Sequence, residues 1–333
     1  MVPTRPELSI VVPVYGSEAV LPELVAQIGT ALGAARDLVP SYEIVFVCDR
    51  SPDGSWGVIQ SLAQRHPEVN GILLRMNAGQ HNALMAGFAR ARGRLIVTMD
   101  DDLQHSPRDI PALLRQIRQG HDVAYARFKN RQHKAWKVMG SRVNNFVADY
   151  LLQKPHDLYL SPFRAMRSEI RDEILRYRGP YVYVDGLILQ ATRNIATVDV
   201  DHYERFAGTS RYGMRKSISL WLKMATNFSI VPLRLTSMLG IMFAGLGFLL
   251  ALLFVIQRFT INVMPVGWSS LIVTLLILGG AQLLALGMIG EYLGRVLLTM
   301  NGRPQYVIDQ TVGTALAAPV QVAAATTPAE MLP

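Results

Sequence analysis

The chain has 333 residues, of which 50% are hydrophobic and only 17% are charged, and its mean hydropathy is +0.22. This composition excludes intrinsic disorder of the whole chain, because so apolar a sequence collapses, and the lone Cys48 excludes a fold stapled by disulfides. The net charge is +8, and residues 1–233 hold 29 basic and 22 acidic residues, so nearly all of the excess lies there. Such a domain favours anionic ligands and membrane headgroups. Nucleic acid is not expected as a partner, because the basic residues form no run and no aromatic residues are interleaved with them.

The first 130 residues alternate short, β-rich apolar runs with longer segments of helical periodicity. We expect strands at 8–14, 43–47, 71–74, 95–99 and 123–126, and helices at 20–32, 83–92 and 109–119. This alternation predicts an α/β fold with a mainly parallel sheet and helices on both faces. Ligands of such sheets bind outside the carboxyl ends of the strands, so the functional site is expected there.

Carboxylates follow two of these strands. Asp49 comes two residues after the second, and Asp100, Asp101 and Asp102 come directly after the fourth. Three adjacent carboxylates repel one another unless a cation lies among them, and residues i and i+2 of an extended turn point the same way. Asp100 and Asp102 could therefore share one hard divalent ion. The alternative is an acidic N-cap for the helix at 109–119, for which one aspartate would be enough.

Residues 235–290 contain a single charged residue, Arg258. A helix at 235–257 would span about 34 Å, enough to cross a hydrocarbon core of about 30 Å, and after a loop at 258–270 a second helix at 271–292 would return. A pair of buried core helices is the alternative, but core helices rarely run past about twenty apolar residues without a polar face. The sequence therefore predicts a transmembrane hairpin.

Basic residues flank the hairpin on both sides: Arg215, Lys216, Lys223, Arg234, Arg295 and Arg303. By the positive-inside rule both ends face the cytoplasm, and no signal peptide precedes the first expected strand. The predicted organisation is a cytoplasmic domain at 1–215, an interfacial amphipathic helix at 216–234, the hairpin, a cytoplasmic segment at 293–310 and a disordered tail at 311–333.

No Walker motif, no Gly-x-Gly-x-x-Gly after the first strand and no serine nucleophile elbow is present in the sequence, which argues against P-loop hydrolysis, dinucleotide redox chemistry and α/β-hydrolase chemistry. Acidic strand ends and a membrane hairpin remain. Together they suggest metal-dependent transfer from a nucleotide-linked donor to a molecule dissolved in the bilayer.

Six segments carry a resemblance to a known family: LSIVVPVY at 8–15, YEIVFVCDRSPD at 42–53, GQHNALMAGF at 79–88, TMDDDLQHSP at 98–107, ERFAGTSRY at 204–212 and GEYLGRVLLTMNGRPQY at 290–306. Together they resemble family 2 glycosyltransferases of the branch that acts on polyisoprenyl phosphates. This branch includes bactoprenol glucosyltransferases, dolichol-phosphate mannose synthases and undecaprenyl-phosphate aminoarabinose-precursor transferases. The resemblance implies a GT-A catalytic domain, a UDP- or GDP-sugar donor, Mg²⁺ or Mn²⁺, a lipid phosphate acceptor and inversion at the anomeric carbon.

The resemblance also implies roles for particular residues. Asp100 and Asp102 would bind the metal and the donor diphosphate, with Gln104 nearby. The other candidate residues for the nucleotide-sugar are Pro13, Tyr15, Glu18, Asp49 and Asp101. The candidate residues for the acceptor phosphate are Arg127, Arg131, Arg205, Ser210, Arg211 and Tyr212. Asp102, Arg127, Arg131 and Asp157 are the candidate catalytic residues. Guanidinium groups suit phosphate oxygens, which supports the arginines.

The sequence departs from the family pattern at several positions. Gly16 and Ser17 replace an Asn-Glu pair, so that Glu18 would substitute only in part, and Arg50 stands where a glycine is usual. Asp157 lies several residues before the place where the bactoprenol branch has an aspartate. His81 is expected to cap or support a helix rather than to bind a ligand.

The resemblance places the enzyme in the bacterial inner membrane, as a multi-pass protein and a homo-oligomer, with a tetramer suggested, and gives it a role in cell-envelope glycan or lipid modification. Two alternatives remain. A processive polysaccharide synthase would need a Gln-x-x-Arg-Trp motif, which the sequence lacks. A non-catalytic nucleotide-sugar binding protein would need neither the paired aspartates nor the arginine-rich segment at 204–212.

Overall fold

The computed structural model describes residues 5–128, 158–179, 182–200, 267–302 and 304–313, and scattered helical residues between 236 and 256. The described chain falls into two compact units. One contains the described residues up to 200 together with those from 304 onward. The other contains the helical residues between 236 and 256 and a long helix that ends at Met300.

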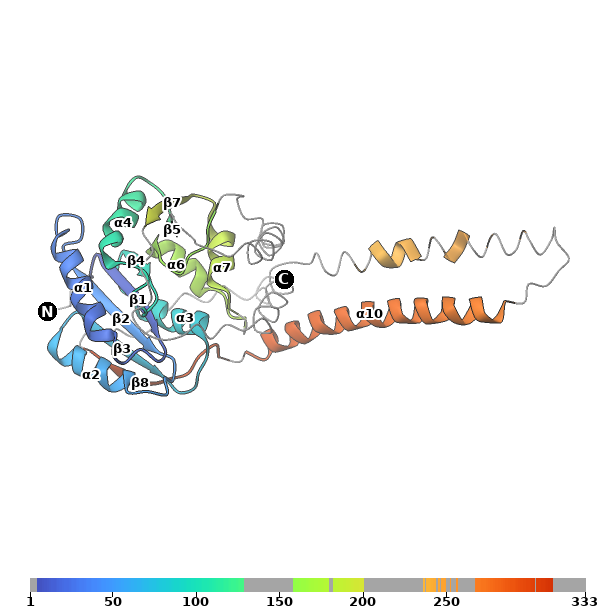
Figure 1. The fold of residues 1–333 in the computed structure, drawn as a ribbon, viewed down its shortest axis with the longest axis horizontal. Helices are drawn as coiled ribbons and strands as arrows, with labels where there is room; N and C mark the ends of the chain where they lie inside the picture. The colour runs from blue at the N-terminus through green and yellow to red at the C-terminus, as the bar shows by residue number, and fades with distance from the viewer. Residues whose placement is uncertain are drawn as a thin grey trace, which may run out of the picture. The chain divides into compact units, whose positions relative to one another are not determined.

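The first unit is built on one eight-stranded sheet with the order β7-β5-β6-β4-β1-β2-β3-β8 (Figure 1). Its strands are β1 Leu8–Val14, β2 Tyr42–Cys48, β3 Val69–Leu74, β4 Leu95–Thr98, β5 Val123–Phe128, β6 Arg164–Arg167, β7 Ile195–Val200 and β8 Ile308–Val312. Its helices are α1 Leu21–Gly33, α2 Ser55–Arg65, α3 Gln80–Arg90, the short η1 Pro107–Asp109, α4 Ile110–Arg118, α6 Ser168–Leu175 and α7 Val184–Ala191. The neighbours in β3-β2-β1-β4 are parallel, as are β5 and β7, whereas β6 and β8 are antiparallel to their neighbours. The expected α/β fold with a mainly parallel sheet is confirmed.

The central strands are apolar on both faces because helices cover both. Ile10 and Val12 of β1 belong to one core cluster with residues of α1, α2 and α4. Val11, which points the other way, faces Gly87 of α3. A strand buried on both sides reads as a continuous apolar run, and this is why the sequence indicated β1 and β2 so clearly.

Gly87 allows α3 to lie close to the sheet. A Cβ atom built at Gly87 would overlap Val11 Cγ1 and come within 3.1 Å of Val47 Cγ2, whereas a Cβ atom at Gly57 of α2 would meet nothing within 4 Å. We expect Gly87→Ala to lower the free energy of unfolding by about 1–3 kcal/mol through overpacking. Gly57→Ala, the matched control, should raise it by about 0.5–1 kcal/mol. Urea unfolding of the two variants checks this, and equal effects would contradict the close approach of α3.

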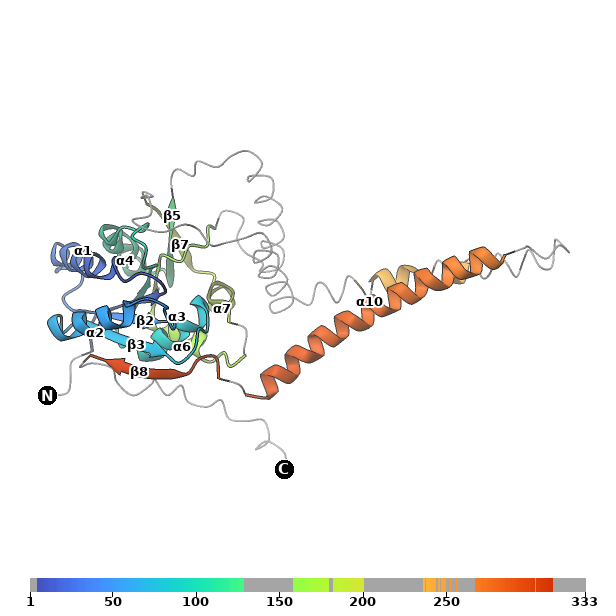
Figure 2. The same ribbon diagram turned by 60° about the horizontal axis from the view of Figure 1, so that its bottom comes forward.

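β8 was not anticipated from the sequence. It includes Thr311 and Val312, which were expected to begin a disordered tail, and it lies antiparallel to β3 at the edge of the sheet (Figure 2). The expected separation of residues 293–310 from the catalytic domain is corrected in the same way, since residues 304–313 belong to the first unit. Ile308, Gln310 and Val312 pair with β3, so backbone pairing compensates for the polar composition of the segment.

The second unit contains α10, Trp268–Met300, a single helix of 33 residues (Figure 1). Its length of about 50 Å exceeds a hydrocarbon core of about 30 Å. Within the described residues it is the one helix long and apolar enough to cross a membrane, over Ile277–Met300 with a mean hydropathy of 1.4. It contains the expected second crossing and continues beyond residue 292. The first crossing is described only in part, as an apolar helix at Met238–Leu249, so the hairpin stays a prediction, and the interfacial helix at 216–234 lies outside the described residues.

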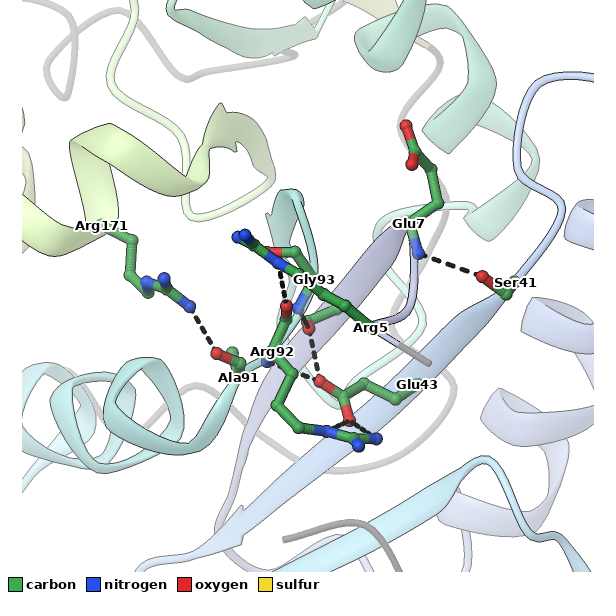
Figure 3. A network of polar contacts seen from close by, with 9 residues as sticks. Arg5, Glu7, Ser41, Glu43, Ala91, Arg92, Gly93 and Arg171 are labelled. Atoms are coloured by element: carbon green, nitrogen blue, oxygen red, sulfur yellow. Dashed lines mark hydrogen bonds and ion pairs between the residues drawn. The ribbon is translucent and has the colours of Figure 1, made fainter. Parts of the chain in front are cut away.

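A buried polar network joins the amino-terminal ends of β1 and β2 to the turn that precedes β4 (Figure 3). Glu43 at the start of β2 accepts hydrogen bonds from the Ser9 hydroxyl at 2.6 Å and the Arg92 amide at 2.7 Å, and its second oxygen meets the Arg92 guanidinium at 2.8 Å. The Ser9 hydroxyl in turn accepts from the Gly93 amide at 2.7 Å. Arg5 donates to the Arg92 and Gly93 carbonyls, so side chains from three parts of the chain fix this edge.

Candidate active site

The candidate site lies at the carboxyl ends of β4, β1 and β2, which are neighbours in the sheet. The sequence places Asp100–Asp102, Tyr15 and Asp49 at these three ends. Tyr15 is 47% exposed at the end of β1, and an accessible aromatic residue there suits stacking against a nucleotide base. Pro13 lies inside β1, two residues before it.

The three aspartates after β4 differ in their contacts. Asp101 accepts a hydrogen bond from the Tyr15 amide at 3.0 Å, which ties the loop to the end of β1. Burial raises the pKa of Asp101, although hydrogen bonds from Ser17 and the Tyr15 amide oppose the rise. Asp100 accepts from Gln80 Nε2 at 2.7 Å, and Asp102 accepts from the Gln104 amide at 3.1 Å. The middle aspartate therefore supports the loop, while those on either side engage α3 and their own turn.

The donor set of this loop fits a hard divalent ion. Asp100 and Asp102 offer carboxylate oxygens, and Mg²⁺ is commonly held by one or two carboxylates together with substrate phosphates. No group of three or more metal-ligating side chains occurs among the residues that the structure describes. The Gln104 contact runs through its backbone amide, so ligation by its side chain stays a prediction.

Asp49 supports the loop that leads into α3. Its carboxylate is buried and accepts from the amides of Ala78 at 2.6 Å and Gly79 at 2.8 Å. Burial raises the pKa of Asp49, and these two bonds oppose the rise. Gly79 has a φ of +87°, which a glycine adopts without cost. The role in base and ribose binding expected for Asp49 is untested, but its position explains why α3 begins where it does.

Gln80 was missed by the sequence reading, although it lies in the quoted segment GQHNALMAGF. It is the first residue of α3, and it links the loop held by Asp49 to Asp100. The signal available in the sequence was its position directly after Gly79, because glycine is favoured immediately before the first turn of a helix.

The loop after β1 is hydrogen-bonded to the turn at residues 51–54. The Gly16 amide donates to Ser51 Oγ at 2.7 Å and the Glu18 amide donates to Asp53 at 3.1 Å. In return Glu18 accepts from the Gly54 amide at 2.9 Å. The structure therefore shows Glu18 supporting this corner, and its expected contact with the nucleotide-sugar remains a prediction.

The expected phosphate-binding residues are only partly described. Arg127 lies on β5, two strands away from β4 in the sheet, and its Nε meets Asp199 of β7 at 2.6 Å. The structure thus gives this guanidinium a carboxylate partner, and its expected contact with the acceptor phosphate stays a prediction. The remaining candidates lie outside the described residues: Arg131, Asp157, Arg205, Ser210, Arg211 and Tyr212.

His81 lies in the first turn of α3 and contacts the first turn of α7. Its Nδ1 accepts from the Val184 amide at 3.4 Å, and its ring lies edge-on to Tyr183. Asp185, which follows Val184 in the chain, forms an ion pair with the fully buried Arg164. It also accepts a hydrogen bond from the Tyr125 hydroxyl at 2.9 Å. His81 therefore joins the first turn of α3 to the start of α7, beside the charged pair of Asp185 and Arg164.

The His81 environment predicts a pH dependence of stability. Burial lowers the pKa of His81 below its ordinary value of about 6.5, so in acid the unfolded chain binds a proton that the folded chain resists. The contribution to stability is therefore present at neutral pH and is lost as the pH falls. We expect the unfolding temperature to fall more in the wild type than in His81→Asn between pH 7.5 and pH 5.5. An equal fall in both proteins would contradict the lowered pKa.

The site lies within a part of the chain that matches a known protein family. The family described as Glycosyl transferase family 2 matches residues 9–175, which is half of the chain. A relative from Photorhabdus laumondii, an undecaprenyl-phosphate 4-deoxy-4-formamido-L-arabinose transferase, is 35% identical over 310 residues, covering 92% of this chain and 94% of the relative. A relative of the same name from Pseudomonas fluorescens is 34% identical over 315 residues, with 94% and 92% covered.

Solved structures with similar folds include a mannosyltransferase from Pyrobaculum calidifontis in complex with GDP-Man and Mn²⁺, at 19% identity and a TM-score of 0.46, covering 67% of this chain and 63% of that one. Glucosyl-3-phosphoglycerate synthase from Mycobacterium tuberculosis is 17% identical with a TM-score of 0.46, covering 66% and 80%. The family match over β1–β6, which carry the aspartate loop, and the identity along nearly the whole chain lead to one assignment: this chain is a member of glycosyl transferase family 2.

Proposed function

We propose that the protein transfers a sugar from a nucleotide-sugar, a UDP-sugar, to undecaprenyl phosphate or a related polyisoprenyl phosphate at the cytoplasmic face of a bacterial inner membrane. The observation that carries the proposal is the aspartate loop after β4, in which Asp101 is tied back to β1 while Asp100 and Asp102 stand on either side of it. Relatives matched along nearly their whole length are named for transfer to undecaprenyl phosphate, which supports the acceptor class.

The acceptor needs little activation. The second pKa of a phosphate monoester is about 6, so at pH 7 the lipid phosphate is largely a dianion and can attack without a strong base. Its oxygen forms a bond to the anomeric carbon while the bond from that carbon to the nucleoside diphosphate breaks. The configuration inverts and the diphosphate leaves with the electron pair.

The protein must bring two anions together. Asp100 and Asp102 would hold Mg²⁺ or Mn²⁺, which when bound neutralises the charge of the leaving diphosphate. Tyr15 and Asp49 would orient the nucleoside, with Pro13, Glu18 and Asp101 supporting the same edge. The acceptor phosphate would meet the basic side chains of Arg127, Arg131, Arg205 and Arg211, with Ser210 and Tyr212 beside them. Asp157 would be a further catalytic residue.

The apolar helices belong to the same proposal. A crossing within α10 and a second at 235–257 would anchor the protein in the membrane where its acceptor is dissolved, with both ends cytoplasmic. Gly240, Gly245 and Gly247 would allow close packing of such helices in a homo-oligomer.

The test is transfer of radiolabelled sugar to undecaprenyl phosphate in detergent, with UDP- and GDP-sugars supplied as a panel and the lipid product identified by mass spectrometry. Undecaprenol, which lacks the phosphate, is the matched acceptor control. We expect a glycosylated lipid product with undecaprenyl phosphate and none with undecaprenol. Hydrolysis of the donor without a lipid product would support a nucleotide-binding protein instead, and a growing polymer would support a processive synthase.

A further inference from the structure

Arg50 has a backbone conformation that side chains rarely adopt. It follows Asp49 at the end of β2, and its φ is +52°, in the left-handed region. An arginine has no local advantage there, since its Cβ crowds the following carbonyl, whereas a glycine adopts the conformation freely. Something outside the corner must therefore favour this conformation of Arg50.

The carboxylate of Asp309 is the partner that the structure provides. Arg50 Nη1 lies 3.8 Å from Asp309 Oδ2, while the other carboxylate oxygen accepts from Arg75 Nε at 3.2 Å and Nη2 at 2.9 Å. One carboxylate thus meets two guanidinium groups, one after β2 and one after β3. The Asp309 side chain is 24% exposed, whereas the Arg50 and Arg75 side chains are 57% and 68% exposed, so only the carboxylate is partly shielded from solvent.

Asp309 is itself held in place by its strand. It lies on β8, which pairs with β3, and the Arg75 amide donates to the Val307 carbonyl at 2.8 Å. Trp56 of α2 donates to the side chain of Gln310 at 3.1 Å. The strand therefore fixes Asp309 relative to the end of β2, although more than 250 residues separate them in the sequence.

The residues on either side of Arg50 both organise the donor end of the sheet. Asp49 holds the Ala78 and Gly79 amides, and Ser51 Oγ accepts from the Gly16 amide. If Arg50 left the left-handed region, the chain would turn these two side chains in other directions.

We propose that Asp309 is a positioning residue for donor binding, which holds Arg50 in the left-handed conformation and so keeps Asp49 and Ser51 aligned. This inference rests on the proposed function, because it assumes that this end of the sheet binds a nucleotide-sugar.

Two substitutions at one position test the proposal. Arg50→Gly and Arg50→Ala both remove the guanidinium group, but only glycine adopts the left-handed conformation freely. We expect the KM for the donor, and the Kd for UDP measured by calorimetry, to stay within about twofold of the wild type in Arg50→Gly. Both should rise about five- to tenfold in Arg50→Ala, with kcat little changed. Arg176→Ala, which removes another exposed arginine from a carboxylate partner, Glu173, is the matched control and should change neither constant.

Asp309→Asn extends the test to the strand. It should raise the same constants as Arg50→Ala does, and adding Arg50→Gly should restore them, because glycine no longer needs the carboxylate. Equal weakening in Arg50→Gly and Arg50→Ala would overturn the proposal and would indicate that the arginine side chain acts directly. If Asp309→Asn fails to fold, Asp309→Ser replaces it, and wild-type constants in either variant would overturn the role of the carboxylate. Wild-type protein that binds UDP but makes no lipid product would refute the proposed function while leaving this contrast measurable.

Discussion

Replacing Asp102 with asparagine is expected to reduce kcat for sugar transfer by about a hundred- to a thousandfold, the usual effect of removing one group that stabilises developing charge. The change keeps the size of the side chain and its acceptor for the Gln104 amide, but it removes the negative charge that would hold a divalent ion against the donor diphosphate. The measurement is single-turnover transfer to undecaprenyl phosphate with saturating donor. Wild-type protein in excess EDTA should show a comparable loss.

The control for this substitution is Asp37→Asn. Asp37 is an exposed aspartate in the turn that follows α1, so the change alters the net charge equally and leaves the aspartate loop intact. Its kcat should equal that of the wild type. Transfer at the wild-type rate by Asp102→Asn, in protein with an unchanged unfolding temperature, would refute the metal-binding role of the loop after β4.

Replacing Glu43 with alanine should lower the free energy of unfolding by about 3–5 kcal/mol, because it leaves a largely buried charge without its partner. The Arg92 guanidinium is only 17% exposed and the Ser9 hydroxyl is fully buried, and both lose their acceptor. For a domain of this size the unfolding temperature should fall by roughly 10 °C. Urea unfolding and a thermal scan, both in the detergent used for the wild type, measure the two quantities.

Glu173→Ala is the matched control for Glu43→Ala, because it also removes a glutamate from an arginine partner. Glu173 pairs with Arg176 one helical turn away, but both side chains are at least half exposed, and such pairs contribute about 0–1 kcal/mol. Because Glu43 lies at the amino-terminal edge of the sheet, the folded fraction of Glu43→Ala should retain the donor KM of the wild type. Similar stabilities for the two variants would show that the network in Figure 3 contributes little.

The sequence predicted the elements whose signal is local. β1 matches the expected 8–14, and the other four expected strands agree within two residues at each end, because buried parallel strands are continuous apolar runs bounded by turn residues. The aspartates after β4 and Asp49 were found because the ends of parallel strands share one edge. The helix expected at 109–119 agrees with α4 within one residue at each end, and η1 precedes it as a separate short turn, since Pro111 cannot donate a backbone hydrogen bond to that turn.

The elements that were missed depend on distant partners. β6 has four residues and includes Arg164, which a sequence reading places at the surface; it is buried because Asp185, 21 residues later, neutralises it. β8 is polar and becomes a strand only by pairing with β3. The contacts of Asp49 are with backbone amides, which no side-chain pattern reveals, and the left-handed Arg50 was visible only as a departure from a glycine.

The position of β8 also sets the order in which the protein can be completed. β3 is an apolar strand near the amino terminus, and until β8 arrives its outer edge offers unpaired amides and carbonyls, the kind of edge that recruits strands from other chains. β8 is synthesised after α10, so the ribosome must make the whole apolar segment before this edge is covered. We therefore expect nascent chains to be most prone to aggregate while residues 235–300 are being synthesised, before β8 can pair with β3.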